Sequence, residues 1–301
     1  MNSLKKFPFT NLVLEGGGVK GIAYAGALKV LADKNILSQI DKVAGTSAGA
    51  ISAALVSMRY TAAEIETIVN KTNFASFEDH KGIFHIATKY GLYRGDAFLD
   101  WMKKQISNKG IPEDATFADF AEKHNCLDLH VFATDLNMHQ VKDFSYKTTP
   151  TTIVAEAVRA SMSIPLFFEA WQFPNSIPDN HIYVDGGTVY NYPISAFDEG
   201  SELNDKTIGF HLDNLSGEPT ENDLGYHHFF KYIKSLFKTL LDAQVIDFDK
   251  NKEQQAQTVR IDDFGISATN FKITPQDKQK LYDSGMKCAT EFLEKYSLPT
   301  A

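Results

Sequence analysis

The sequence predicts an α/β fold with a central, mainly parallel sheet, and three observations support this prediction. Within the first sixty residues, apolar patterns follow one another in the order strand, helix, strand, helix. Each strand runs directly into a glycine-containing loop, which places both loops at the carboxyl ends of strands, where active sites of open parallel sheets form. The chain has 301 residues, 43% of them hydrophobic, and is long enough to bury a large core.

The first two strand–helix pairs are expected near the N-terminus. Residues 11–15 form a short β-type run, the glycine-rich loop 16–21 follows it, and residues 22–33 carry apolar side chains at helical spacing. A second strand is expected over residues 40–44, and a second helix over residues 48–58.

The rest of the chain continues the alternation of strands and helices. Expected elements are a mostly helical region over 60–125, a strand over 127–136, a short helix over 153–160, a connection rich in proline around Pro165, Pro174 and Pro178, strands over 182–184 and 207–212, and a helix over 274–296. We expect residues 8–200 to form a catalytic domain. Residues 201–301 are expected to be the C-terminal part of the same domain.

Composition excludes several classes of protein. The net charge is −8 and no Lys/Arg cluster stands out, which argues against a nucleic-acid partner. Two distant cysteines, Cys126 and Cys288, give no disulfide framework and no zinc spacing. The sequence has no secretory signal and no apolar stretch of the roughly 20 residues that a membrane span requires. A cytoplasmic protein is expected, and secretion without a cleaved signal is compatible with the sequence.

The turn after the second expected strand carries a G-x-S-x-G motif, Gly45-Thr46-Ser47-Ala48-Gly49. In a strand-to-helix turn of this kind the serine hydroxyl lies in the open, and the flanking glycines remove Cβ atoms that would collide with neighbouring backbone. The N-terminus of the following helix favours developing negative charge. Ser47 is therefore a candidate acyl-transfer nucleophile.

The earlier loop, 16–21, allows two interpretations. It matches the dinucleotide fingerprint G-x-G-x-x-G, but that site needs an acidic residue at the end of the second strand, whereas Asp41 lies at its beginning. As an oxyanion hole, the loop would aim backbone N–H groups at one point, with Lys20 adding positive potential or bracing the loop. The simplest alternative is a tight turn under a helix.

A serine nucleophile needs a base, and Asp185 is the candidate. It ends an expected strand and is followed by Gly186 and Gly187, which permit close backbone approach. A partly buried carboxylate within reach of a hydroxyl accepts its proton as the nucleophile attacks. Taken alone, Asp-Gly-Gly is equally typical of a turn.

Several blocks of the chain, in this order, resemble the patatin-like phospholipases, which are lipid acyl hydrolases with a Ser–Asp dyad. The sharper blocks are Gly-Gly-Gly-Val-Lys-Gly at 16–21, Gly-Thr-Ser-Ala-Gly at 45–49 and Asp-Gly-Gly at 185–187; residues 133–136 and 160–168 are softer matches. The resemblance covers residues 11–200, and the C-terminal third resembles bacterial members more loosely.

The resemblance implies a three-layer α/β/α sandwich, with Ser47 as nucleophile and Asp185 as general base. It implies hydrolysis of fatty acyl esters of the phospholipase A or lysophospholipase type, with no cofactor and no metal. Backbone amides around Gly17, Gly18 and Val19 would form the oxyanion hole. The motif positions around these groups are Gly16, Lys20 and Gly21 in the first block, Gly45 and Gly49 in the second, and Gly186 and Gly187 in the third.

Three alternatives stay open at this point. An α/β-hydrolase triad would run Ser47, Asp185, His211, although with nine histidines in the chain a structural role for His211 is the simpler interpretation. An acyltransferase would use the same nucleophile with an alcohol as acceptor. A non-catalytic lipid-binding protein would keep the fold without needing Ser47 or Asp185.

The segment from Tyr226 to Gln244 combines apolar residues at helical spacing with three lysines. The apolar positions are Phe229, Phe230, Ile233, Leu236, Phe237, Leu240 and Leu241, and the lysines are Lys231, Lys234 and Lys238. Such a helix either contacts a phospholipid surface or packs on the core. Phe167, Phe168 and Phe271 are candidates for lining an acyl-chain groove.

Overall fold

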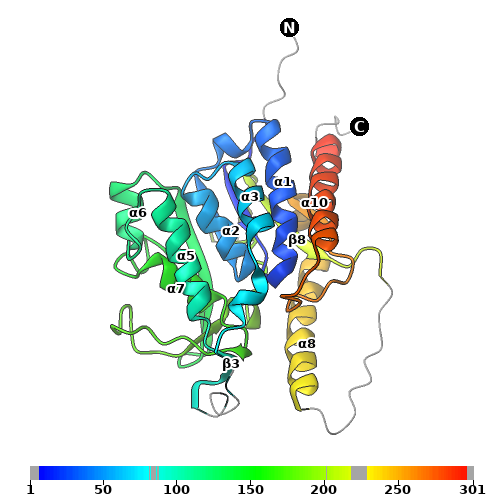
Figure 1. Ribbon diagram of the computed structural model, residues 1–301. Coiled ribbons are helices and arrows are strands. Elements are labelled where there is room, and N and C mark those ends of the chain that lie inside the picture. The colour runs from blue at the N-terminus through cyan, green and yellow to red at the C-terminus, as the bar shows by residue number, and fades with distance from the viewer. Residues whose placement is uncertain are drawn as a thin grey trace.

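The computed structural model (Figure 1) describes residues 7–80, 82, 86, 88–200, 202–217 and 229–296. Within these residues, seven strands form one sheet in the order β5-β4-β2-β1-β8-β9, and β7 pairs with β4 as well. The parallel strands are β1 (Asn11–Leu14), β2 (Lys42–Thr46), β4 (Asp128–Asp135), β8 (Thr207–Asp213) and β9 (Thr258–Asp262). The strands β5 (Gln140–Phe144) and β7 (Tyr183–Asp185) run antiparallel to β4. A small second sheet pairs β3 (Gly91–Tyr93) with β6 (Leu166–Phe168).

The helices flank this sheet. They are α1 (Ile22–Asp33), α2 (Ala48–Ser57), α3 (Ala62–Lys71), α5 (Asp96–Asn108), α6 (Phe117–Lys123), α7 (Val154–Ser161), α8 (Phe229–Lys250), α9 (Lys252–Ala256) and α10 (Pro275–Tyr296). Short 3₁₀ turns are η1 (Gly18–Gly21), η2 (Leu37–Gln39), η3 (Phe74–Phe77) and η4 (Gly186–Thr188). The predicted α/β class with a mainly parallel sheet is therefore confirmed.

Successive side chains of the strands point to opposite faces of the sheet and pack into two cores, one on each face. Leu12 and Leu14 of β1 belong to the large core, which α1, α2, α3 and α10 cover. Val13, between them, belongs to a smaller core with Ile194 and Phe197 on the opposite face. Figure 1 shows α10 beside α1, so the end of the chain packs against its first helix.

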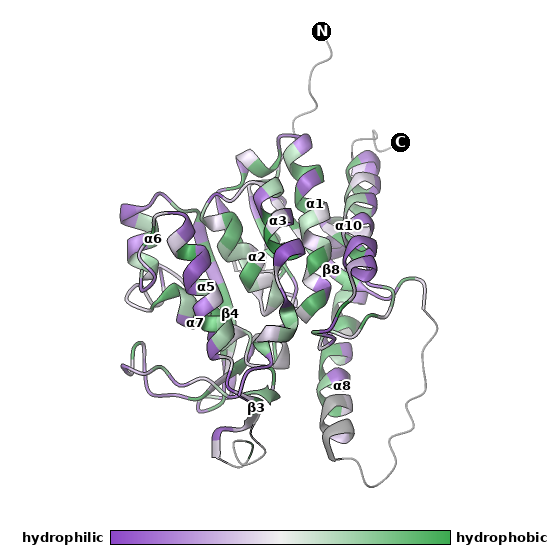
Figure 2. Cartoon of the chain, in the orientation of Figure 1, coloured by the Kyte–Doolittle hydropathy of each residue, from purple (hydrophilic) through white to green (hydrophobic). Residues whose placement is uncertain are grey.

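The helix after the serine turn is almost entirely buried. In α2 every residue except Ile51 is buried, and small alanines let its backbone approach β1 and β2 closely. Figure 2 shows the apolar character of this helix, which lies between α1 and α5. A fully buried helix fixes the position of its own N-terminus, and the N-cap residue of α2 is Ser47.

Several elements differ from their expected bounds. The second strand begins at Lys42 instead of residue 40, and β6 lies within the proline-rich connection. The strands β5 and β9 lie at the two edges of the sheet and were not predicted, because short edge strands carry little apolar patterning.

The lysine-containing segment forms α8, which ends at Lys250 and so extends six residues beyond the expected end. Tyr226 lies outside the described residues, as do the side chains of Phe229, Phe230, Lys231, Ile233 and Lys234. Among the residues that the structure describes, no helix has the length and apolar character needed to cross a bilayer.

Candidate active site

Ser47 and Asp185 are brought together by two strands that share one edge of β4. In the register, Thr46 at the end of β2 pairs with Phe132, and Asp185 at the end of β7 pairs with the next residue, Ala133. Because β2 runs parallel and β7 antiparallel to β4, the two strands point toward each other and their final residues meet. The way these two strands pair with β4 therefore places the candidate nucleophile next to the candidate base.

The backbone at Ser47 adopts the strained conformation of a sharp strand-to-helix turn. Its φ is 52° and its ψ is −120°, values that cost a non-glycine residue about 1–3 kcal/mol. The turn is tight because Gly45 and Gly49 lie against each other and against β1: a Cβ on Gly45 would collide with the Gly49 carbonyl, and one on Gly49 with the Leu14 carbonyl. These collisions explain the glycines of the motif.

Asp185 carries one satisfied and one unsatisfied carboxylate oxygen. Oδ1 accepts a hydrogen bond of 2.7 Å from the Gly187 N–H, whereas Oδ2 is buried without a hydrogen-bond partner among the described residues. Burial raises the pKa of Asp185 to about 7, against an ordinary value of 3.8. The Ser47 hydroxyl and the Gly187 N–H partly offset this effect of burial on the pKa.

The Ser47 hydroxyl is therefore close to Asp185, although no hydrogen bond of ordinary geometry joins the two side chains. Its proximity favours the carboxylate form of Asp185 and lowers the pKa. The absence of a partner for Oδ2 leaves that oxygen able to accept a proton. Both side chains are almost completely buried, with Ser47 3% and Asp185 2% exposed.

Two backbone amides of the glycine loop are free to bind an anion. The Gly16 N–H donates to the Asn191 carbonyl at 3.0 Å, and the Val19 N–H donates to the Ala268 carbonyl at 3.0 Å. Among the described residues, no acceptor faces the N–H groups of Gly17 and Gly18. The Val19 N–H is therefore already hydrogen-bonded in the structure. Of the three expected oxyanion donors, the N–H groups of Gly17 and Gly18 remain as candidates.

The segment between β9 and α10 braces this loop from one side. Lys20 Nζ forms a 2.6 Å ion pair with the buried carboxylate of Asp263. Gly18 has a φ of 55°, and a Cβ there would collide with the Ala268 carbonyl. Of the two roles considered for Lys20, the geometry matches bracing.

A buried amide braces the loop from the other side. Asn191 Nδ2 donates to Glu15 Oε1 at 2.9 Å and to the Gly16 carbonyl at 3.3 Å. Gln244 of α8 accepts from the Asn191 N–H at 2.7 Å and donates to the Gly187 carbonyl at 2.8 Å. The glycine loop, the Asp185 turn and α8 are therefore held in one hydrogen-bond network.

His211 lies in β8 and contacts Glu15 and Phe248. Its Nε2 is 3.5 Å from Glu15 Oε1, and its ring stacks on Phe248 at 4.8 Å between centroids. Its Nδ1 is buried without a partner among the described residues. The structure records no contact of His211 with Ser47 or Asp185.

Two other groups of side chains lie outside the candidate dyad. The ligand atoms of Asp135, Asp179 and His181 lie within 4.8 Å of one another; His181 Nδ1 is hydrogen-bonded to Asp135 Oδ2 at 2.8 Å, and the Tyr183 hydroxyl donates to Asp179. The bond between His181 and Asp135 holds β7 beside β4. Phe167 and Phe271 stack at 5.1 Å between centroids and pack in the large core, and Phe271 also lines the cavity at the start of α10.

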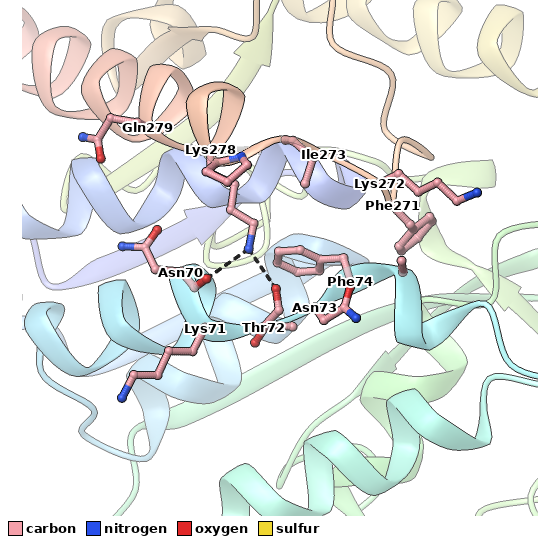
Figure 3. Close-up of a pocket in the computed structure, with 12 residues that line it drawn as sticks. Asn70, Lys71, Thr72, Asn73, Phe74, Phe271, Lys272, Ile273, Lys278 and Gln279 are labelled. Atoms are coloured by element: carbon pink, nitrogen blue, oxygen red, sulfur yellow. Dashed lines mark hydrogen bonds between the residues drawn. The ribbon is translucent and has the colours of Figure 1, made fainter.

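A cavity of about 660 Å³ lies between the end of α3 and the start of α10 (Figure 3). Neither Ser47 nor Asp185 lines it. Lys278 is one of its lining residues. Its Nζ donates hydrogen bonds to the backbone carbonyls of Val69, Asn70 and Thr72, at 2.9, 3.2 and 2.8 Å. The lysine therefore caps the C-terminal end of α3.

Sequence reasoning missed several residues that hold the site in place. They are Glu15, Asn191, Gln244, Asp263 and Ala268, together with Ser161, whose hydroxyl contacts the Ser47 backbone. All act across long separations in sequence, so local periodicity carries no signal for them. Weak signals exist for two of them: Asn191 follows Asp185 within the same short loop, and Ser161 lies in the softer matching block 160–168.

The chain belongs to the family of the patatin-like phospholipases. The family model matches residues 12–198, more than half of the chain. The predicted family membership is confirmed, and with it the assignment as a hydrolase of lipid acyl esters.

Individual relatives agree with this assignment. The chain is 32% identical to the uncharacterized protein YqhO of Bacillus subtilis (strain 168), over 95% of this chain and 98% of that protein. It is 29% identical to the probable lipid hydrolase 463L of Invertebrate iridescent virus 6, over 64% of each chain. The crystal structure of VipD from Legionella pneumophila superposes with a TM-score of 0.68 at 16% identity, covering 96% of this chain and 67% of VipD. That likeness shows the fold alone.

The raised pKa of Asp185 gives a pH-dependent effect on stability. The unfolded carboxyl loses its proton above about pH 4 and the folded one only above about pH 7, so stability falls between these values, by about 4 kcal/mol in total. The Asp185→Asn variant has a neutral side chain at this position at every pH, in the folded and in the unfolded state. We expect its free energy of unfolding, relative to that of the wild type, to rise by about 2–3 kcal/mol from pH 5 to pH 8.

Urea denaturation at both pH values measures this difference. Asp119→Asn is the control, because capping contacts lower the pKa of Asp119 to about 2, and its effect should not change between pH 5 and pH 8. A pH-independent difference for Asp185→Asn as well would contradict the raised pKa.

Proposed function

We propose that this protein cleaves fatty acyl esters of the phospholipase A or lysophospholipase type, with Ser47 as nucleophile and Asp185 as general base. The observation that carries the proposal is the buried, unpartnered Oδ2 of Asp185 beside the Ser47 turn. An unsatisfied buried carboxylate oxygen is costly to folding and is expected where a proton must be accepted.

The first half of the reaction forms an acyl-enzyme. Ser47 Oγ attacks the ester carbonyl while its proton passes to Asp185, and the carbonyl oxygen becomes an oxyanion that the Gly17 and Gly18 N–H groups stabilise. The tetrahedral intermediate then collapses. The bond from the carbonyl carbon to the alcohol oxygen breaks, and the proton on Asp185 passes to the leaving alcohol or lysolipid.

The second half reverses these roles with water as the nucleophile. Asp185 accepts a proton from water, the hydroxide attacks the acyl carbonyl, and the same proton returns to Ser47 Oγ as the fatty acid leaves. If an alcohol replaces water, the same steps give acyl transfer. Product analysis with and without an added alcohol distinguishes hydrolase from acyltransferase.

The C-terminal part of the chain is proposed to belong to the same catalytic unit. Asp263 and Ala268 hold the glycine loop, and Gln244 holds the Asp185 turn. Both contacts cross from residues 201–301 to residues 8–200. A binding module that lacked catalysis would have no need for either contact.

Covalent labelling tests the nucleophile. We expect a fluorophosphonate probe to modify Ser47 and no other residue, as located by mass spectrometry of the digested protein. Ser47→Ala and Asp185→Asn should each lower hydrolysis of a short-chain ester by at least about a thousandfold, since members of a nucleophile–base pair act as one unit.

His211→Ala is the matched test of the rival triad. Because His211 faces Glu15 and Phe248, we expect it to keep most of the activity in a variant with unchanged stability. A thousandfold loss of kcat in a folded His211→Ala variant would support the triad instead. Folded wild-type protein that is never labelled would support a non-catalytic lipid-binding role.

The pKa of the base predicts a pH profile. Asp185 must be ionised to accept a proton, so kcat/KM is expected to fall about tenfold per pH unit below about pH 7. A histidine base would give a similar profile. The dyad therefore requires that His211→Ala keeps the same midpoint, and a flat profile from pH 5.5 to pH 7.5 argues against Asp185 as base.

Contact with a lipid surface is proposed to occur through α8. Tyr232, Leu236 and Leu240 recur every fourth residue along this helix and are 55%, 45% and 43% exposed. Leu241, next to this stripe, approaches Gly187 in the turn after Asp185. An exposed apolar stripe this close to the dyad suits an interfacial helix that delivers lipid to the site.

Replacing two leucines of the stripe tests the lipid contact. Leu236→Ser with Leu240→Ser should weaken binding to phosphatidylcholine–phosphatidylglycerol vesicles by about tenfold or more, because two apolar side chains no longer enter the lipid. Cleavage of a short water-soluble ester should be unchanged.

The control is Tyr146→Ser, an exposed aromatic that bonds to Glu122 of α6, on the opposite side of the molecule from α8 (Figure 1). It should leave vesicle binding intact. Equal loss of vesicle binding and ester cleavage in the double variant would point to a folding role for the stripe.

A further inference from the structure

The C-terminal end of α7 contacts the backbone of both members of the dyad. Ser161, its last residue, accepts a 2.8 Å hydrogen bond from the Ser47 N–H through its hydroxyl oxygen. Two residues later, the Ser163 carbonyl accepts a 2.8 Å hydrogen bond from the Asp185 N–H. One short segment thus fixes where both catalytic backbones lie.

The Ser161 hydroxyl bridges two backbone groups from a fully buried position. It donates to the Phe132 carbonyl at 2.5 Å while accepting from Ser47, and Ser161 is completely buried. Phe132 is the register partner of Thr46, the residue before the nucleophile. The hydroxyl therefore links the end of β2 to β4 at the point where regular pairing stops.

The N–H of Ser47 needs such an acceptor because of its backbone conformation. Ser47 follows the last paired residue of β2 and adopts a φ of 52°, and the Ser161 hydroxyl, in place of a strand carbonyl, is the acceptor of its N–H in the described structure. A buried N–H without a partner would favour relaxation of the turn out of this strained conformation. Relaxation would move Ser47 Oγ relative to Asp185.

We propose that Ser161 is a positioning residue that holds the Ser47 turn in its reactive conformation. The proposal rests on the proposed function for the role of Ser47, but the positioning itself is a property of the fold. Ser161 touches neither the substrate nor the transferred proton. It acts through the backbone of the nucleophile.

Ser57, the last residue of α2, provides a matched control. It is also completely buried, and its hydroxyl donates to the Leu127 carbonyl at 2.9 Å, just before β4. Ser57→Ala, like Ser161→Ala, removes one buried hydroxyl that donates to a backbone carbonyl. Only Ser161→Ala also removes the acceptor of the Ser47 N–H.

The experiment compares kcat, KM and the rate of fluorophosphonate labelling in these variants. We expect Ser161→Ala to lower kcat and the labelling rate by about 10–100-fold with KM unchanged, as a small misplacement of a reacting group does. Ser57→Ala should stay within about threefold of wild type. Equal rates in the two variants would overturn the proposal.

Amide hydrogen exchange separates failure of this proposal from failure of the proposed function. The Ser47 N–H should exchange faster in Ser161→Ala than in Ser57→Ala, whether or not the protein has esterase activity. If Ser161→Ala does not fold, Ser161→Cys replaces it, because its weak sulfur acceptor should give intermediate exchange and labelling. Unchanged exchange at Ser47 in the folded variant overturns the positioning role even if Ser47 is the nucleophile.

Discussion

Two strands of opposite direction occupy the same edge of β4, and the site depends on where they stop. The parallel strand β2 ends opposite Phe132, and the antiparallel strand β7 ends opposite Ala133. A shift of either strand by two residues would keep its side chains on the same faces but separate Ser47 from Asp185 by a further 6–7 Å. The pairing register, more than any side-chain contact, therefore sets the distance between Ser47 and Asp185.

The energetically unfavourable features of this region lie at the residues proposed to carry out the chemistry. The Ser47 turn is strained, Asp185 is buried with one oxygen unsatisfied, and two glycine amides face no acceptor. The surroundings are well bonded by contrast: Glu15, Asn191 and Lys20 each find partners within 3.3 Å. A rigid, satisfied shell around a few unsatisfied groups is the pattern expected of a preorganised site.

Much of the catalytic half could be predicted from the sequence, because its signals are local. The helix over 22–33 coincides with α1, and the glycine loop and the serine turn follow the strands that were expected to carry them. The edge strands β5 and β9 were not predicted because each has only five residues, although most of β9 is buried. The hydrogen bond from the Val19 N–H to the Ala268 carbonyl was not predicted either, because every residue type has a backbone carbonyl. This bond occupies the Val19 N–H and so removes it from the candidate oxyanion donors.

The brace on the glycine loop has a consequence for the order in which the protein acquires its structure. Lys20 and Asp263 are separated by 243 positions, and Ala268 lies later still. During synthesis, the serine turn and the Asp185 turn emerge from the ribosome well before the segment that holds the oxyanion donors in place. In a nascent chain the glycine loop would therefore lack this brace until Asp263 and Ala268 had been made, even though the two turns it lies beside were already complete.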